Sequence, residues 1–554
     1  MNGIFVALTF ALIFGAAALW GAWRARTVAS WPLLDRLLAL VMPPLCVLTA
    51  FEFLGQFGDA VSQSGCLWTG NRLTPAFALT HGYELYYGPS TGPIIGMIYG
   101  PVMALAYLPA TLASSPTGAL VAGSSISMLL FFGPVAWMHL GGRVRDARSL
   151  APSIVGLLCF CLLSLGMSSF WTGFWVHADP PALGLTAAAC GLLCLYDPRK
   201  RLILPAAAVL AVLACWAKQP AAFLIPAMLL YVFLNHGLAA LRRFAGWLAL
   251  AGVVVSGGMV LAFGWEHLVF NMFTVPRGHF QQGPLDAPGP LSARAFALSA
   301  MTQYKRLVAD LTLPLVMIAF TVLLSIVRPE GAREQRLAAI IRHRWIILFM
   351  AGVAGLPAAI IGGVKIGGAA NVLAYATYFV SAAATLSLVE LSTKPAHQGA
   401  GTAAGGAKML LLAVGIALAV SNLPPSIHEV RKGLADLSGN CQQQAYDFAR
   451  AHPGEVYYPW HPLPTLMAEG KLYHFSYGMF DRELAGFPVT EGHFREGIPE
   501  GVRYIGLPIH HPPIASRYPP EFSREIRVPQ LPEWRVLIRP SDPEAERDAQ
   551  AVAP

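Results

Sequence analysis

Charged residues are scarce in this chain of 554 residues. Asp, Glu, Lys and Arg make up 12% of the sequence, whereas 55% of it is hydrophobic and the mean hydropathy is +0.54. This balance excludes a soluble enzyme, a fibre and a disordered chain. The apolar residues form long blocks of roughly the 20 residues that cross a bilayer. We therefore predict an all-α polytopic membrane protein.

Cysteine is also sparse, with eight residues. Six lie in or beside apolar blocks, where we expect them to pack as small hydrophobic side chains. Cys66 and Cys441 fall in polar segments and either pair in an oxidising compartment or stay free. Two free thiols are the favoured interpretation, because nothing in the sequence sets their separation. No cysteines or histidines have zinc spacing, so we predict no cofactor and no metal, although a divalent ion stays possible.

The positive charge does not indicate a nucleic-acid partner. The net charge is +8 and the pI is about 9.1. However, Lys and Arg lie mostly between the apolar blocks, where they set the orientation of a protein in a membrane. The expected partner at this stage is therefore the lipid bilayer.

Thirteen apolar blocks can be read along the chain. They span approximately 3–22, 34–54, 93–113, 118–139, 152–170, 182–196, 202–217, 221–235, 246–264, 309–327, 345–363, 371–391 and 408–424. If all crossed, the basic loop at Arg143 would face the opposite side from Arg24 and Arg26, against the positive-inside rule. Block 93–113, with its three prolines, is the best candidate for a juxtamembrane helix. About twelve transmembrane helices then remain.

Two regions differ in composition. Residues 1–424 hold the apolar blocks, with a first outer loop at 55–117. From about residue 425 onward, charges and prolines become frequent and apolar runs shrink to strand length. We predict that residues 425–554 form a small, soluble, extracytoplasmic α/β domain.

Ionisable residues gather where apolar blocks meet the outer side. Such residues are costly near a membrane and usually line a cavity or a water path. The candidates are Asp59, Glu84, His177, Asp179, Lys218, Gln219, Arg277 and Lys365. Carboxylates suit a base that deprotonates a hydroxyl, and Lys or Arg suits a phosphate. The combination indicates a lipid-phosphate substrate.

Three of these residues also have a structural interpretation. Asp59 can be a solvated helix end, and Asp179, followed by two prolines, can be a helix N-cap. Lys218 lies in a very short turn, where a lysine that anchors the chain at the interface is as good an explanation as a ligand contact.

The outer segments resemble the GT-C fold of membrane glycosyltransferases that use polyprenyl-phosphate sugars, a superfamily with protein O-mannosyltransferases and aminoarabinose transferases. The resemblance rests on four motifs. They are Asp59 after a first core span, G-x-x-x-Y-Y-G-P at 82–89 followed by Tyr-Gly-Pro at 99–101, Asp-Pro at 179–180, and Lys-Gln at 218–219. One departure is that Ala60 follows Asp59, so the adjacent acid pair of the mannosyltransferases is missing.

The resemblance implies a mechanism and roles. A sugar on a polyprenyl monophosphate would move with inversion to an acceptor hydroxyl that Asp59 deprotonates. Acceptor binding would involve Glu84, His177 and Asp179, while Lys218, Gln219, Arg277 and Lys365 would hold the donor phosphate. The acceptor, a glycan, a lipid or a protein, stays open. The membrane would be the inner (plasma) membrane, with the site and the C-terminal domain extracytoplasmic.

A polytopic transporter or lipid flippase is the alternative function. It also needs many spans with polar residues at membrane depth, but it often has internal symmetry, and the sequence contains no clear repeat. The one-sided clustering of the candidates favours surface chemistry.

Overall fold

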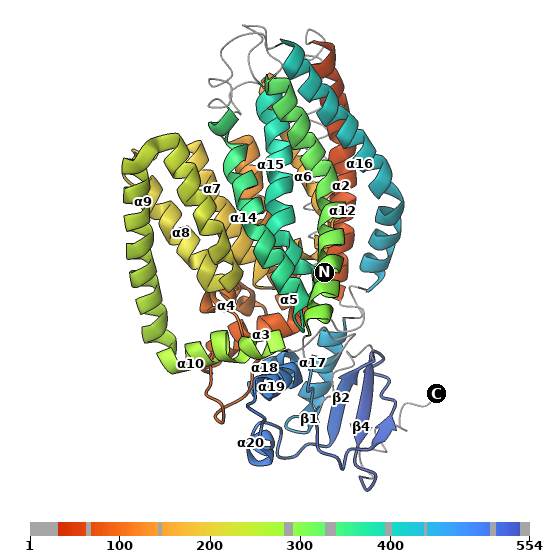
Figure 1. The fold of residues 1–554 in the computed structure, drawn as a ribbon. Helices are drawn as coiled ribbons and strands as arrows, with labels where there is room; N and C mark the ends of the chain where they lie inside the picture. Colours follow the sequence, from red (N-terminus) through yellow and green to blue (C-terminus); the bar gives the residue numbers. More distant parts are fainter. Residues whose placement is uncertain are drawn as a thin grey trace.

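The computed structural model describes residues 32–62, 68–141, 147–281, 292–326, 340–393, 401–436, 440–509 and 517–542. A tall body of helices carries a smaller domain with a sheet at one end (Figure 1). The predicted class, a polytopic helical membrane protein with a small α/β domain, is confirmed. The apolar block at 3–22 lies outside the described residues.

Within the described residues, seven helical segments are long and apolar enough to cross a membrane, and three shorter apolar helices accompany them. The longer ones include α2 (Leu33–Ser62), α5 (Pro116–Leu140), α9 (Ile225–Phe263), α12 (Ala293–Ile326), α14 (Trp345–Val364), α15 (Ala374–Ser392) and α16 (Gly401–Asp436). The shorter ones are α6 (Ala147–Leu165), α7 (Asp179–Leu195) and α8 (Ile203–Ala217).

Helix α15 lies at the centre of the body. About 94% of its apolar window is buried, more than in any other described span. It is rich in Ala, Ser and Thr, small residues that let helices approach closely. On the neighbouring α14, a side chain at Gly355 would lie 2.1 Å from the Tyr375 carbonyl oxygen. Helices α14 and α15 therefore pack closely, and the connection between them contributes to the site below.

The first outer loop is more helical than predicted. Helix α3 (Trp68–Thr80), which the apolar pattern did not indicate, precedes an irregular stretch. The expected continuous helix at 93–113 is wrong in detail, because the block holds only α4 (Pro101–Ala106) and the 3₁₀ turn η1 (Leu108–Leu112). Each begins with a proline at its first turn, and six helical residues reach only about 9 Å. The block therefore does not cross, as predicted.

Helix α9 folds back on itself. Gly237 has φ +77°, a conformation open mainly to glycine, and divides α9 into two limbs visible in Figure 1. The chain then continues through α10 (Trp265–Val269), the π-helical turn η4 (Phe270–Thr274), α11 (Val275–Gly278) and the 3₁₀ turn η5 (His279–Gln281). This segment runs across the end of the body, beside the small domain (Figure 1).

Residues 440–509 and 517–542 of the C-terminal domain form four helices and a four-stranded sheet. The helices are α17 (Cys441–Ala451), α18 (Pro462–Glu469), α19 (Ser476–Leu484) and α20 (Glu491–Glu496). The strands are β1 (Val456–Tyr457), β2 (Tyr504–Pro508), β3 (Arg524–Ile526) and β4 (Trp534–Ile538). The sheet order is β1-β2-β4-β3, with β1 and β2 parallel and the other pairs antiparallel. The predicted boundary at 424 falls inside α16, which continues to Asp436.

The C-terminal domain is docked on the first outer loop by hydrogen bonds. The Phe475 N–H donates to the Ile94 carbonyl at 2.9 Å, and the Tyr83 hydroxyl donates to the Gly470 carbonyl at 3.1 Å. The buried guanidinium of Arg482 donates to the Pro89 carbonyl at 3.0 Å. These contacts join segments almost 400 residues apart, so the domain is an integral part of this end of the molecule.

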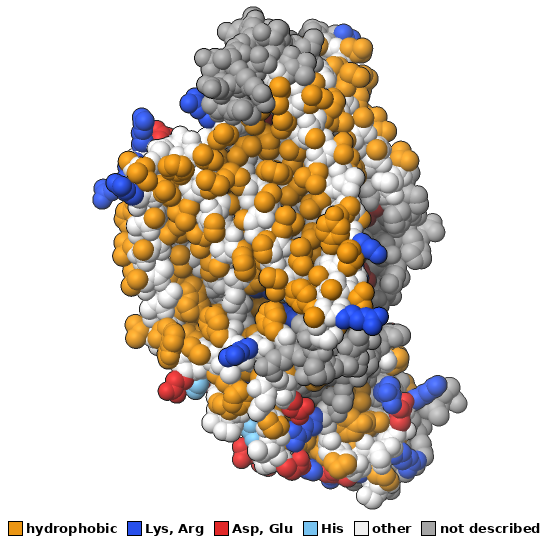
Figure 2. All heavy atoms as spheres, in the orientation of Figure 1, with side chains coloured by type: hydrophobic (Ala, Val, Ile, Leu, Met, Phe, Trp, Pro, Cys, Tyr) orange, Lys and Arg blue, Asp and Glu red, His pale blue; other side chains and the backbone are white. Residues whose placement is uncertain are grey.

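The face of the helical body seen in Figure 2 is largely hydrophobic. Helix α9 exposes Leu250, Val253 and Leu261, and acidic side chains gather instead on the C-terminal domain (Figure 2). A body that exposes this much apolar surface suits a bilayer rather than water.

Cysteine pairing differs from the favoured interpretation. Cys441 is disulfide-bonded, so the preference for a free thiol at this position is wrong. Cys66 lies outside the described residues. The six cysteines of the apolar blocks are free, and four of them are buried, as expected for packing residues.

Candidate active site

A cavity of about 790 Å³ lies between the end of the helical body and the C-terminal domain. Its walls come from α3, the stretch before α4, the segment 171–177 before α7, the α8–η3 turn, the η4–η5 segment, the end of α14 with the α14–α15 connection, and α19. Aromatic side chains line much of it: Trp68, Tyr99, Trp171, Trp175, Tyr375 and Tyr477. Its volume is typical of small-molecule sites.

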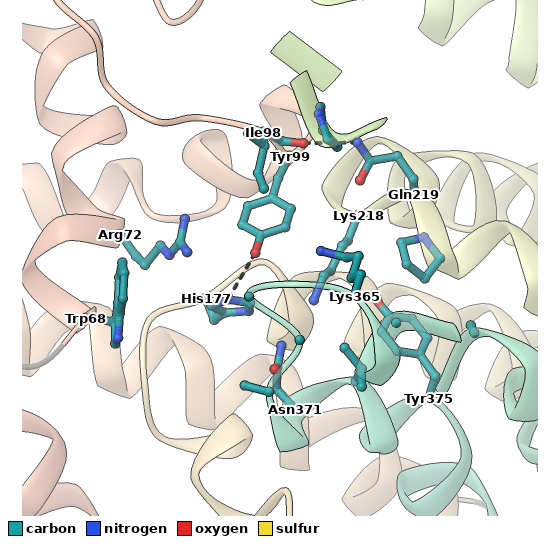
Figure 3. A pocket seen from close by; sticks show the side chains of 18 of the residues that line it. Trp68, Arg72, Ile98, Tyr99, His177, Lys218, Gln219, Lys365, Asn371 and Tyr375 are labelled. Carbon is teal, nitrogen blue, oxygen red and sulfur yellow. Dashed lines mark hydrogen bonds between the residues drawn. The ribbon is translucent and has the colours of Figure 1, made fainter. Parts of the chain in front are cut away.

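Four cationic side chains line this cavity, each from a different element. They are Arg72 on α3, Lys218 after α8, Arg277 on α11 and Lys365 after α14. Figure 3 shows Arg72, Lys218 and Lys365 around Tyr99 and His177. The described lining contains no carboxylate, so the cavity is strongly positive and suits an anion.

Asp179 lies directly behind the cavity wall and balances one of these charges. Its side chain is fully buried. One carboxylate oxygen accepts from Lys218 Nζ at 2.7 Å, and the other accepts from Asn371 Nδ2 at 2.6 Å and contacts His177 Nδ1. The N-cap interpretation of Asp179 is wrong, because the N-cap of α7 is Ala178. The carboxylate instead ties three cavity residues together.

Tyr99 stands between two cations. The Arg72 guanidinium lies 5.1 Å and Lys218 Nζ 5.3 Å from its ring centroid, within the range of cation–π attraction. The Tyr99 hydroxyl lies 3.4 Å from His177 Nε2 (Figure 3). Burial lowers the pKa of His177 to about 4, although the neighbouring Asp179 opposes this shift. The imidazole is therefore neutral near pH 7 and is oriented by Asp179.

Local sequence explains the position of the two lysines. Helix α8 ends at Ala217, and the 3₁₀ turn η3 (Gln219–Leu224) starts at once with a proline in its first turn, which leaves Lys218 extended at the junction. Lys365 likewise follows the last residue of α14 and precedes Gly367, whose φ of +70° requires a glycine. A side chain at Gly367 would also lie 2.6 Å from the Tyr477 hydroxyl.

The structure brings together six of the eight sequence-predicted residues. His177, Lys218, Gln219, Arg277 and Lys365 line the cavity, and Asp179 supports it. Gln219 differs from the rest, because its amide already donates to the Ile98 and Met272 carbonyls at 3.1 and 3.0 Å. It holds the cavity wall and offers no free donor to a phosphate.

Two predicted residues are not part of the described lining. Asp59 lies in the last turn of α2, not beyond its end as expected, because the helix continues to Ser62. Glu84 is on the surface, where 65% of its side chain is exposed and its carboxylate lies 3.8 Å from His267 Nδ1. The roles predicted for both remain predictions.

Sequence reasoning missed several lining residues. Arg72 and Trp68 lie on α3, a helix of 13 residues with an internal proline that has no clear apolar period. Tyr477 comes from the C-terminal domain, and only docking brings it to the cavity. Arg72 was nevertheless a detectable signal, since it is the one Lys or Arg residue in the first outer loop at 55–117.

The described residues contain no group of three or more His, Cys, Asp or Glu side chains that would hold a metal ion.

Comparisons with known proteins support the fold. No known family model matches the chain, and no curated protein matches it. Among solved structures, the chain is similar to the crystal structure of ArnT from Cupriavidus metallidurans bound to undecaprenyl phosphate. The TM-score is 0.52 at 13% identity, over 90% of this chain and 98% of that chain. This chain has an ArnT-like fold. The expected resemblance to GT-C membrane glycosyltransferases is therefore confirmed at the level of the fold.

Proposed function

We propose that this chain is an integral-membrane glycosyltransferase that moves a sugar from a polyprenyl-monophosphate donor to an acceptor hydroxyl, with inversion. The observation that carries the proposal is the cavity at the end of the body, which combines aromatic walls with four cations and no described carboxylate in its lining. A phosphate on a lipid matches both properties. ArnT, a structure with the same fold, was crystallised with undecaprenyl phosphate, which supports this donor class.

The charge balance supports a phosphate ligand. Lys218 is neutralised by Asp179, whereas Arg72, Arg277 and Lys365 form no ion pair with a described carboxylate. Their positive charge would stabilise the phosphate that leaves when the glycosidic bond breaks, as fixed donors do at sites of developing negative charge. Arginine and lysine together suit this role, one as a fork and one as a point charge.

A buried polar atom at the cavity also supports a polar ligand. Arg72 Nε is buried without a hydrogen-bond partner in the described part of the chain. Such atoms cost free energy unless a ligand or water satisfies them. The aromatic rings of Trp68, Trp171 and Trp175 offer flat apolar surface for a sugar ring.

The acceptor proton needs a base, and two residues are candidates. Asp59 is the choice that the family resemblance implies. His177 is the choice that the geometry favours, because its neutral imidazole lines the cavity while its other nitrogen contacts Asp179. Transfer by His177→Gln and Asp59→Asn variants distinguishes them. We expect His177→Gln to lower the transfer rate by about 100-fold or more, as loss of a general base does, and Asp59→Asn to stay near wild type.

We further propose that the cavity and the C-terminal domain face the extracytoplasmic side of an inner (plasma) membrane. The basic loops predicted on the opposite side and the disulfide at Cys441 support this orientation, since disulfides persist in oxidising compartments. The acceptor would be a glycan, lipid or protein on that side, and we propose no cofactor.

Transfer of labelled sugar from a panel of polyprenyl-phosphate donors to a membrane extract tests the function. Arg72→Gln and Arg277→Gln should each lower transfer at least about tenfold, because each removes a charged contact to phosphate. The matched control is Arg294→Gln, an exposed arginine outside the cavity lining, which should transfer as wild type does. No transfer by any protein across the panel would favour the transporter or flippase alternative.

A further inference from the structure

Three residues from three elements form a continuous chain of polar contacts into the cavity. Lys365 Nζ lies 3.3 Å from His279 Nδ1, and His279 Nε2 lies 2.9 Å from Asp481 Oδ1. Lys365 follows α14, His279 begins η5, and Asp481 lies on α19 of the C-terminal domain. The chain therefore connects the small domain to a cation of the candidate site.

The chemistry of the three groups sets the direction of each proton. An ammonium group only donates, so His279 Nδ1 must accept from a protonated Lys365. His279 Nε2 then carries the ring proton and donates it to the Asp481 carboxylate. The second oxygen of Asp481 is buried without a partner in the described part of the chain. In the described part of the chain, the Asp481 carboxylate therefore accepts from His279 and, through His279, is connected to Lys365.

The three residues are held where water has little access. The side chains of His279 and Asp481 are 2% and 1% exposed. Their elements are packed tightly, since a side chain at Gly278 would lie 2.7 Å from the backbone of Ala485, just after α19. In such surroundings a carboxylate acts strongly on a nearby ammonium group, because little solvent screens them.

We propose, resting on the function proposed above, that Asp481 and His279 are positioning residues through which the C-terminal domain keeps Lys365 protonated and directed at the donor phosphate. The domain is then part of the anion site. Removal of the charge of Asp481 should therefore change lipid-phosphate binding, although Asp481 does not line the cavity.

The affinity of the cavity for a phosphate should depend on pH through the protonation of Lys365. Burial lowers the pKa of Lys365 to about 8, the negative Asp481 opposes this shift, and Lys218 and Arg72 add to it. The other ionisable groups around Lys365 are His279, Arg277 and Tyr477, and burial raises the pKa of Tyr477 far above this range. Affinity for a phosphate should thus fall as pH rises through about 8. Removal of the Asp481 charge should move that fall to lower pH.

The test is binding of undecaprenyl phosphate to the purified full chain in detergent, followed by tryptophan fluorescence from about pH 6 to pH 10. The quantity of interest is the ratio of the Kd of Asp481→Asn to that of wild type, because titration of the lipid phosphate itself cancels in this ratio. We expect the ratio to be near one at pH 6 and to rise to about fivefold at pH 8, for a shift of about one pKa unit from the wild-type value of about 8. It should approach tenfold above about pH 9, where only a small protonated fraction of Lys365 remains in either protein.

The direction in which the Kd of Asp481→Asn changes distinguishes a positioning role from the simple removal of a nearby negative charge. Removal of a negative charge near an anion site would by itself tighten binding at every pH. Equal or tighter binding by Asp481→Asn throughout would therefore overturn the inference. The control Glu491→Gln, an exposed carboxylate of the same domain, should bind as wild type does. Absence of binding by wild type would instead refute the proposed function.

A second variant keeps the test valid if Asp481→Asn does not fold. Lys365→Arg retains a cation that does not titrate below pH 10. We expect this variant to keep its affinity from about pH 7 to pH 10 while wild type loses affinity. An identical alkaline loss in both proteins would show that Lys365 is not the titrating group and would overturn the inference.

Discussion

The pair formed by Asp179 and Lys218 allows a quantitative test of the cavity wall that needs no substrate. Both side chains are buried, and the 2.7 Å contact is joined by Asn371, which donates to the other carboxylate oxygen at 2.6 Å. Asp179→Asn keeps the shape but leaves Lys218 as an uncompensated buried charge. Breaking such a pair costs about 3–5 kcal/mol.

Lys218→Met should cost less than Asp179→Asn. The carboxylate of Asp179 then still accepts from Asn371, and His177, which contacts it, can take up a proton and replace the lost positive charge. The double variant removes both charges at once. Its destabilisation should be smaller than the sum of the two single effects by about 2–3 kcal/mol, as for residues in one buried network.

Unfolding rates of the purified protein in detergent measure this cycle, since they stay meaningful where unfolding is irreversible. Asp447→Asn, an exposed carboxylate in the C-terminal domain, is the control and should change stability by less than about 0.5 kcal/mol. Additivity of the two single variants within about 0.5 kcal/mol would refute the coupling that the structure implies.

Three further predictions concern other parts of the chain. Burial lowers the pKa of His474 to about 4, below the roughly 6.5 of an unfolded chain, so stability should fall by about 1.4 kcal/mol per unit as pH drops from 6.5 towards 4. His474→Gln should flatten that slope in acid unfolding curves. An unchanged slope would show that His474 does not cause this loss of stability. Gly184→Ala should lower the temperature of thermal unfolding, because its Cβ would lie 2.1 Å from a carbonyl oxygen of α5. Gly246→Ala, with open space around it, should leave that temperature unchanged or raise it slightly. Glu84→Gln should leave sugar transfer unchanged, since its exposed side chain is outside the described cavity lining; a loss of transfer would restore the role predicted from sequence.

Much of the architecture could be predicted from local sequence. Apolar length and basic loops indicate the spans, and prolines identify 93–113 as a segment that does not cross. Asp179 and Lys218 were recognisable because each lies one or two residues before a proline at the end of an apolar block, where a charged side chain is costly. These signals depend only on neighbours in sequence.

The remaining features depend on contacts between distant segments. Tyr477 reaches the cavity, and Asp481 reaches His279, because the C-terminal domain docks on the first outer loop, a contact that no periodicity encodes. Asp59 was placed beyond its helix because the hydrophobic pattern weakens before the hydrogen-bonded helix ends. The helical form of the segment around Arg72 similarly depends on packing against neighbours, not on its own propensity.

The proposed function requires this cavity to hold the phosphate end of a polyprenyl phosphate. Photo-crosslinking with an undecaprenyl phosphate analogue that carries its reactive group beside the phosphate locates that phosphate, with adducts identified by mass spectrometry. We expect adducts within α3, the η4–η5 segment and the α14–α15 connection, all suppressed by excess undecaprenyl phosphate. Adducts spread over the lipid-facing surface, or adducts that excess lipid phosphate does not suppress, would contradict the proposed function.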